Sequence, residues 1–158
     1  MSLATNPGFV PLETAVEKGA NFVAFIQASD LAAFTTAGAA GTLNLFSILG
    51  NAQGAELVHS DLITPFQNTA DAANNTTQIE VGDAGNAARL LGETELNANG
   101  TYVNLAFGTG TKYAPTANTV VTATLGAPAA GKKLSDLNVG KVALYFRIFD
   151  ARVTQGTN

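Results

Sequence analysis

The stretch that decides the fold is Lys141-Val-Ala-Leu-Tyr-Phe-Arg-Ile-Phe-Asp-Ala-Arg-Val153, near the end of the chain. Successive side chains of a β-strand point to opposite faces. One face here would carry Val142, Leu144, Phe146 and Ile148, and the other Ala143, Tyr145, Arg147 and Phe149. Large apolar groups occur on both faces, which is typical of an inner strand. We therefore expect Tyr145 or Phe149 to be covered by a second sheet, a loop or a neighbouring subunit.

Seven further segments have the β-branched or aromatic composition of short strands, and Gly, Pro, Asn and Asp separate them. They are residues 21–27, 42–49, 55–63, 76–81, 88–91, 101–105 and 118–125. We expect reversals at 82–87 and 97–100, and a short hairpin connection at 51–54. Across the first reversal, we expect Leu90 to return beside Ile79 or Val81. Helical signals are weak, with a turn or two at 11–19 and a single turn at 29–34. The sequence predicts an all-β fold, a single antiparallel β-sandwich, jelly-roll-like, of about eight strands.

The first twenty residues hold only a few apolar anchors, and their spacing fits neither a core strand nor a core helix. These anchors are Leu3, Phe9, Val10 and Leu12. We expect residues 1–20 to form an extended arm laid on another surface, with terminal disorder as the alternative, and residues 21–158 to form the sandwich domain.

Composition limits the kinds of partner. Charged residues make up 13% of the 158 residues, and eight Lys and Arg are set against twelve Asp and Glu. Affinity for nucleic acid comes mainly from Lys and Arg that displace counterions, so we expect no nucleic-acid partner and read Lys132-Lys133 as a solvated turn. The sequence contains no apolar run of about 18 residues, so we expect no helix that spans a membrane. The chain has no Cys and begins without a secretory pattern, which favours synthesis in a reducing cytosol.

Few residues could carry chemistry. His59 is the only imidazole, and Ser60 beside it in a strand faces the other way, so we expect a structural histidine. A single His excludes zinc sites built on two or three, and no glycine-rich phosphate motif opens a helix. Glu93, Glu95 and Asp83 remain the residues of the enzyme alternative, a sugar-processing one. We expect no enzyme, no metal and no cofactor, and a plain turn at Asp83 to Asn86.

The order of five segments carries a family resemblance. They are residues 55–66 ending in Thr64-Pro-Phe66, 77–83 with Ile79-Glu-Val-Gly-Asp83, 88–96 with Leu90-Leu91, 99–102 (Asn-Gly-Thr-Tyr), and 140–150. This order is similar to that of small structural proteins of tailed bacteriophages, in which an Ile-Xaa-Val-Gly-Asp hairpin follows such a strand and a Gly-initiated strand closes the domain. The resemblance covers roughly residues 42 to 150.

The resemblance implies a non-enzymatic head decoration (cement) or auxiliary protein, made in the host cytoplasm and located in the virion on the capsid exterior. Its partner would be the major capsid protein, and it would often be a trimer. The alternative is another virion component, such as a tail protein, a head-fibre base or a host-surface-binding module. From the residues themselves we predict partner contacts at Leu3, Phe9, Val10 and Leu12 of the arm and at Tyr145 and Phe149 of the closing strand.

Overall fold

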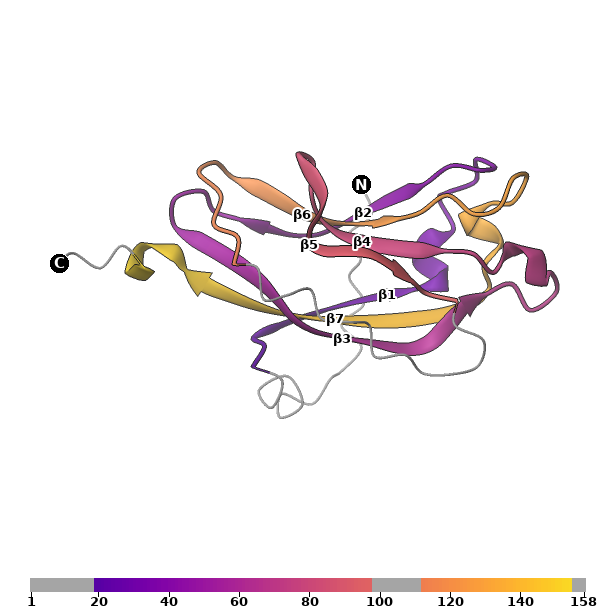
Figure 1. The fold of residues 1–158 in the computed structure, drawn as a ribbon, viewed down its shortest axis with the longest axis horizontal. Coiled ribbons are helices and arrows are strands. Elements are labelled where there is room, and N and C mark those ends of the chain that lie inside the picture. Colours follow the sequence, from indigo (N-terminus) through magenta and orange to yellow (C-terminus); the bar gives the residue numbers. More distant parts are fainter. Residues whose placement is uncertain (1–18, 98–111, 155–158) are drawn as a thin grey trace.

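Residues 19–97 and 112–154, which the computed structural model describes, form two antiparallel sheets that face each other (Figure 1). The strands are β1 (Phe22–Gln27), β2 (Gly41–Ile48), β3 (Gln53–Gln67), β4 (Gln78–Asp83), β5 (Asn86–Glu95), β6 (Thr119–Leu125) and β7 (Val139–Asp150). Four 3-10 turns complete this part of the chain: η1 (Ala28–Leu31), η2 (Ala72–Asn74), η3 (Leu134–Asp136) and η4 (Ala151–Thr154). The all-β prediction is confirmed.

The two sheets have different widths. One has the order β1-β7-β3 and the other β2-β6-β4-β5, and every pairing is antiparallel. The deciding stretch is therefore the central strand of its sheet, paired with β1 on one side and β3 on the other. This confirms the prediction of an inner strand.

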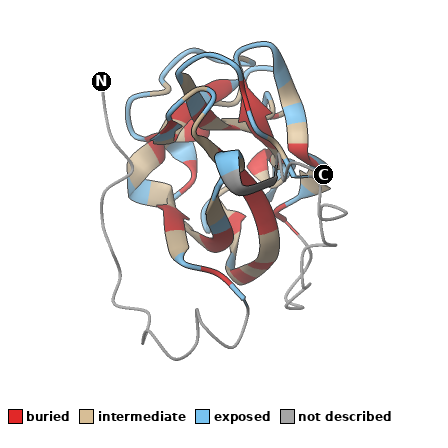
Figure 2. Cartoon of the chain, turned by 90° about the vertical axis from the view of Figure 1, so that its left-hand side faces the viewer, coloured by how far each residue is buried: buried red, intermediate tan, exposed pale blue. Residues whose placement is uncertain are grey.

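One apolar core fills the space between the sheets. Figure 2 shows the buried positions, in red, mainly on the strands, and the exposed ones, in pale blue, mainly on the connecting loops. Val142, Leu144 and Phe146 of β7 belong to this core, as the alternation predicted. The opposite sheet contributes buried residues such as Val121, and Phe46 packs edge-on to Phe146 with ring centroids 4.9 Å apart. Burying both sheets' inner faces in this shared core is the main force that holds the sandwich together.

The second face of β7 is also covered. Ala143 and Tyr145 form a smaller buried cluster with Ala20 and Phe25. Just after Ala20, the Asn21 side chain clamps Ile148, accepting from its N–H and donating to its carbonyl, both at 2.7 Å. The packed sandwich thus already includes Ala20.

Most strand predictions match to within two residues, but four features differ. β7 ends at Asp150, three residues before the predicted end at Val153, because a 3-10 turn follows it. β3 and β5 are longer than expected at both ends. The 51–54 connection is not a hairpin, because β2 and β3 lie in different sheets, so this prediction was wrong. Leu91, and not Leu90, lies opposite Val81. The predicted strand at 101–105, the helical turns at 11–19 and most of the 97–100 reversal lie outside the described residues. Within the described part, no helix is long and apolar enough to cross a bilayer.

Candidate functional site

The part of the four-stranded sheet's outer face formed by β2 and β6 carries short, uncharged side chains, and Glu80 of β4 borders it opposite Thr124. We call it the threonine face and define it by Thr42 and Asn44 of β2 and by Val120, Thr122 and Thr124 of β6. Their neighbours along each strand are buried in the core, so these residues point outward. The hydroxyls of Thr42 and Thr124 lie 3.3 Å apart across the strands, and Val120 is 40% exposed. Such side chains lose little rotamer entropy when a partner covers them.

The β4–β5 hairpin borders this face, and its sequence explains its shape. A Cβ at residue 82 would lie 2.0 Å from the backbone carbonyl oxygen of Asn86, so only glycine fits there. The next residue, Asp83, accepts hydrogen bonds from the N–H groups of Gly85 (2.7 Å) and Asn86 (2.9 Å) through Oδ1. The reversal predicted at 82–87 is confirmed, and the Gly-Asp pair is its cause.

Asp83, Arg89 and Tyr113 form a compact cluster near the turn of the hairpin. Arg89 Nε donates to Asp83 Oδ2 at 2.6 Å, and the guanidinium carbon lies 4.4 Å from the centre of the Tyr113 ring. The Tyr113 hydroxyl hydrogen-bonds Asp83. Its backbone exchanges two hydrogen bonds with Ala55 of β3, at 2.8 and 2.9 Å. The cluster therefore ties an edge of one sheet to an edge of the other.

The electrostatics of this cluster keep Asp83 ionised. Burial by itself raises the pKa of the carboxyl group, which is 5% exposed. The hydrogen bonds from Arg89, Tyr113, Gly85 and Asn86 outweigh burial and lower the pKa of Asp83 to about 2. The hydrogen bond between Arg89 and Asp83 also raises the pKa of Arg89. A carboxylate this strongly bound is a poor general acid or base near neutral pH.

A depression of about 490 Å³ lies between this cluster and the threonine face. Its lining includes Arg89, Tyr113, Asn44, Val120 and Thr122. This volume falls within the range of about 300 to 1,000 Å³ that is usual for ligand pockets. More of the wall surface is apolar than polar, and its charged groups are Arg89 and the carboxylate of Asp83 that pairs with it.

A second, smaller depression of about 290 Å³ contains one of the predicted contact residues, Phe149. The Phe149 ring lies over Gly54, where a Cβ would come within 2.4 Å of it. Phe149 itself is half-buried, and Leu49 beside it is 55% exposed. Phe149 is thus accessible to a partner, although it already packs within its own chain.

Tyr145 is buried within this chain, with 4% of its surface exposed. Burial, followed by the nearby charge of Asp61, raises its pKa. Its ring lies 5.5 Å from that of His59, whose Nε2 is 2.6 Å from Asp61 Oδ1. Leu3, Phe9, Val10 and Leu12, the predicted arm contacts, lie outside the described residues. The structure therefore brings none of the described contact residues to the threonine face.

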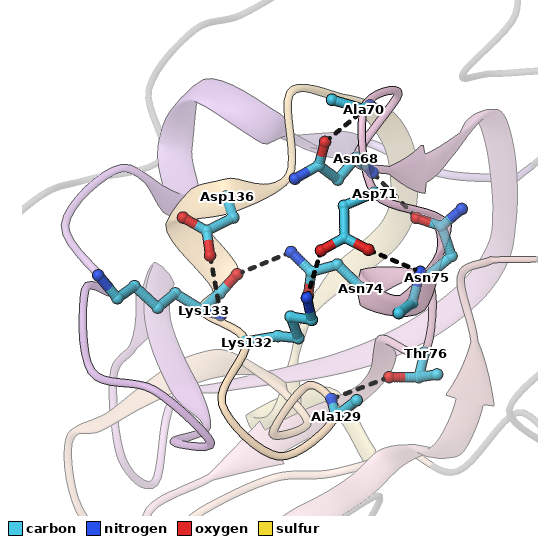
Figure 3. Close-up of polar contacts among 11 residues, drawn as sticks. Asn68, Ala70, Asp71, Asn74, Asn75, Thr76, Ala129, Lys132, Lys133 and Asp136 are labelled. Carbon is cyan, nitrogen blue, oxygen red and sulfur yellow. Dashed lines mark hydrogen bonds and ion pairs between the residues drawn. The ribbon is translucent and has the colours of Figure 1, made fainter.

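The loops at the right-hand end of Figure 1 form a polar network, drawn in Figure 3. Asp71 pairs with Lys132, and this bond lowers the pKa of Asp71. The buried Asn74 side chain donates to the Lys133 carbonyl at 3.2 Å, and the Ala129 N–H donates to Thr76 at 3.1 Å. The basic doublet is thus part of a loop contact, with Lys132 fixing one loop to the other.

The residues of the enzyme alternative do not converge. Glu93 and Glu95 are exposed in β5, whereas Asp83 is enclosed at the hairpin. Over residues 19–97 and 112–154, no three His, Cys, Asp or Glu side chains are grouped to hold a metal ion. Asp83 is instead fully engaged in the turn.

Arg89 and Tyr113 are residues that the sequence reasoning missed. An acid in a tight turn followed six residues later by Arg signals a pair across the hairpin, so Arg89 could have been found. No local signal identifies Tyr113, because it reaches Ala55 from far along the chain. Comparison with known families, with curated proteins and with solved structures found no match to the chain.

Proposed function

We propose that this chain is a non-enzymatic decoration protein of a phage head, which attaches to the shell of the major capsid protein and stabilises it. The threonine face carries the proposal. It is an outward surface of short neutral side chains with an exposed valine and an adjoining depression. The five side chains that define the face carry no charge, so covering them costs little rotamer entropy and little desolvation, as repeated weak contacts on a shell require.

The order of the segments supports the same proposal. The resemblance to phage structural proteins lies in the order of the five segments, from residues 55–66 to the closing strand at 140–150, and not in any one motif. Weak contacts repeated by symmetry give a large gain in avidity, so each copy can bind modestly. We further propose that the bound form is a trimer on the outside of the capsid.

The test is location together with shell stability. Particles with and without the protein would be imaged and heated. We expect density on the outer shell and a higher melting temperature when the protein is present. Density only at a tail or a fibre would favour the other virion role, and no density on any particle, with unchanged melting, would exclude both.

A further inference from the structure

Arg89 is held in place but uses only part of its hydrogen-bonding capacity. Its Nε–H and one Nη2–H donate to Asp83, at 2.6 and 3.4 Å, and its guanidinium carbon lies over the Tyr113 ring. A guanidinium group has five N–H donors. Among the described residues no acceptor is found for the other three, and Arg89 lines the depression beside the threonine face.

Asp83 cannot serve an incoming ligand. Its two oxygens already accept from Arg89, Tyr113 and the backbone of Gly85 and Asn86. A carboxylate offers about four lone-pair positions, so its capacity is filled. The charged group that a ligand meets in the depression is therefore Arg89.

The residues around Arg89 determine which kind of anion the depression would bind. Asn44, Thr122 and Val120 line the depression without charge, and Lys112, next to Tyr113 in sequence, is exposed. Asp83 offsets part of the Arg89 charge, and Glu80 lies on the same sheet, opposite Thr124. The charges of Arg89 and Lys112 are thus balanced by those of Asp83 and Glu80, and a site with so little net charge suits a monovalent carboxylate better than a divalent phosphate.

Building on the function proposed above, we propose that the depression anchors attachment by taking an Asp or Glu side chain of the shell protein in a paired contact with Arg89. The planar guanidinium fits a carboxylate with two parallel hydrogen bonds. Arg and Tyr are also the residues that most often dominate binding energy at protein interfaces. Because Asp83 and Tyr113 fix the Arg89 side chain beforehand, little rotamer entropy is lost on binding.

The first test compares three arginine variants for binding to shells that lack the protein. Arg89→Gln should weaken binding about tenfold or more, and Arg89→Lys should fall between it and the wild type, since Lys cannot form the paired contact. Arg147→Gln is the matched control, because Arg147 pairs with Glu56 on the other sheet and lies outside this depression. Equal binding by Arg89→Gln and the wild type would overturn the inference.

The second test leaves the Asp83 cluster intact, in case Arg89→Gln misfolds. Val120→Glu should weaken shell binding, and Val120→Lys should preserve or strengthen it, because the two changes add charges of opposite sign at an exposed position in the depression. Equal weakening by both would show a contact by shape alone and would overturn the carboxylate occupant.

A third test needs no shells and so separates this inference from the proposed function. Sodium acetate titrated into isotopically labelled protein should shift the Arg89 Nε–H resonance saturably, without shifting that of Arg147. No shift at Arg89 would overturn carboxylate recognition. Glucuronate binding more than about tenfold more tightly than acetate would replace the protein carboxylate by an acidic sugar. If acetate binds but shells do not, the proposed function fails and the carboxylate site stands.

Discussion

Single residues fix the hairpin that borders the threonine face, and Gly82 is the most constrained of them. The obstacle to a side chain there is the backbone of Asn86, which cannot swing away as a flexible side chain can. Gly92 lies in the same hairpin, is exposed, and has no atom within 4 Å of the position a Cβ would take. The two glycines lie in the same hairpin, but only Gly82 is crowded by neighbouring backbone, so Gly92 is a suitable control.

We predict that Gly82→Ala lowers the free energy of unfolding by about 2 to 4 kcal/mol, as strained backbone substitutions do. The matched change Gly92→Ala should stay within about 0.5 kcal/mol of the wild type. Urea unfolding of both variants measures this. Equal stability of the two would show that the hairpin relaxes around the added methyl group.

Asp83 predicts a pH dependence with a definite sign. Its pKa is lowered to about 2 in the folded protein, against an ordinary value of about 3.9 in an unfolded chain. Its ionised form therefore stabilises the fold above about pH 4, and this contribution, about 2 kcal/mol, is lost as the pH falls through about 2.

Unfolding free energies measured from pH 5 to pH 2 should therefore decline less steeply for Asp83→Asn than for the wild type. Asp150 provides the comparison, since its pKa is also about 2 but its pair with Arg152 is exposed. Asp150→Asn should change the slope less than Asp83→Asn does. The reverse order would mean that the enclosed cluster is not what acid disrupts.

Among the elements, the two end loops are joined by several polar contacts, of which only the one made by Asn74 comes from a fully buried side chain. Asn74 is fully buried, and its amide nitrogen satisfies the Lys133 carbonyl. We predict that Asn74→Ala costs about 1 to 3 kcal/mol, because that carbonyl then loses its partner. Lys132→Met, which removes a partly exposed ion pair, should change stability less. Thermal unfolding of the two variants would show whether the buried bond matters more.

Strand β3 pairs with β7 along one edge. Along its other edge, the described residues make backbone hydrogen bonds only near the two ends of the strand. The Phe66 N–H donates to the Leu96 carbonyl at 2.9 Å, and Ala55 exchanges two bonds with Tyr113. Leu96 and Tyr113 flank the segment in which the sequence predicts a strand at 101–105. The order of the described strands is also that of a jelly roll from which the strand between β5 and β6 is left out. The jelly-roll form stays a prediction, and slow amide exchange at 101–105 would support it.

Period-two alternation was enough to predict the β7 faces, because a strand's side chains obey that period whatever surrounds them. Local turn chemistry was enough for the 82–87 reversal. What failed depended on partners distant in sequence: whether β2 pairs with β3, which residue lies opposite Val81, and that Tyr113 reaches Asp83. A short loop can join two paired strands or two strands of different sheets. The sequence analysis relied on the length of the 51–54 loop, and its hairpin prediction was therefore wrong.

For the whole molecule, the boundary between arm and sandwich sets a further prediction. Ala20 is buried and Asn21 clamps Ile148, so a truncation should end at residue 18. Removing residues 1–18 should leave the unfolding midpoint within about 2 °C of the full chain while weakening attachment to shells. Circular dichroism and shell sedimentation together measure both effects. Loss of folded protein would place the segment within the domain, and unchanged sedimentation would remove its role in attachment.

Val120 also offers an experimental opportunity. The chain contains no cysteine, so Val120→Cys would provide a single reactive thiol at an exposed position on the threonine face. An environment-sensitive fluorophore attached there would change its emission as soon as any partner displaced water from that surface. The protein could then be used to detect its own binding partner in a mixture of purified virion components.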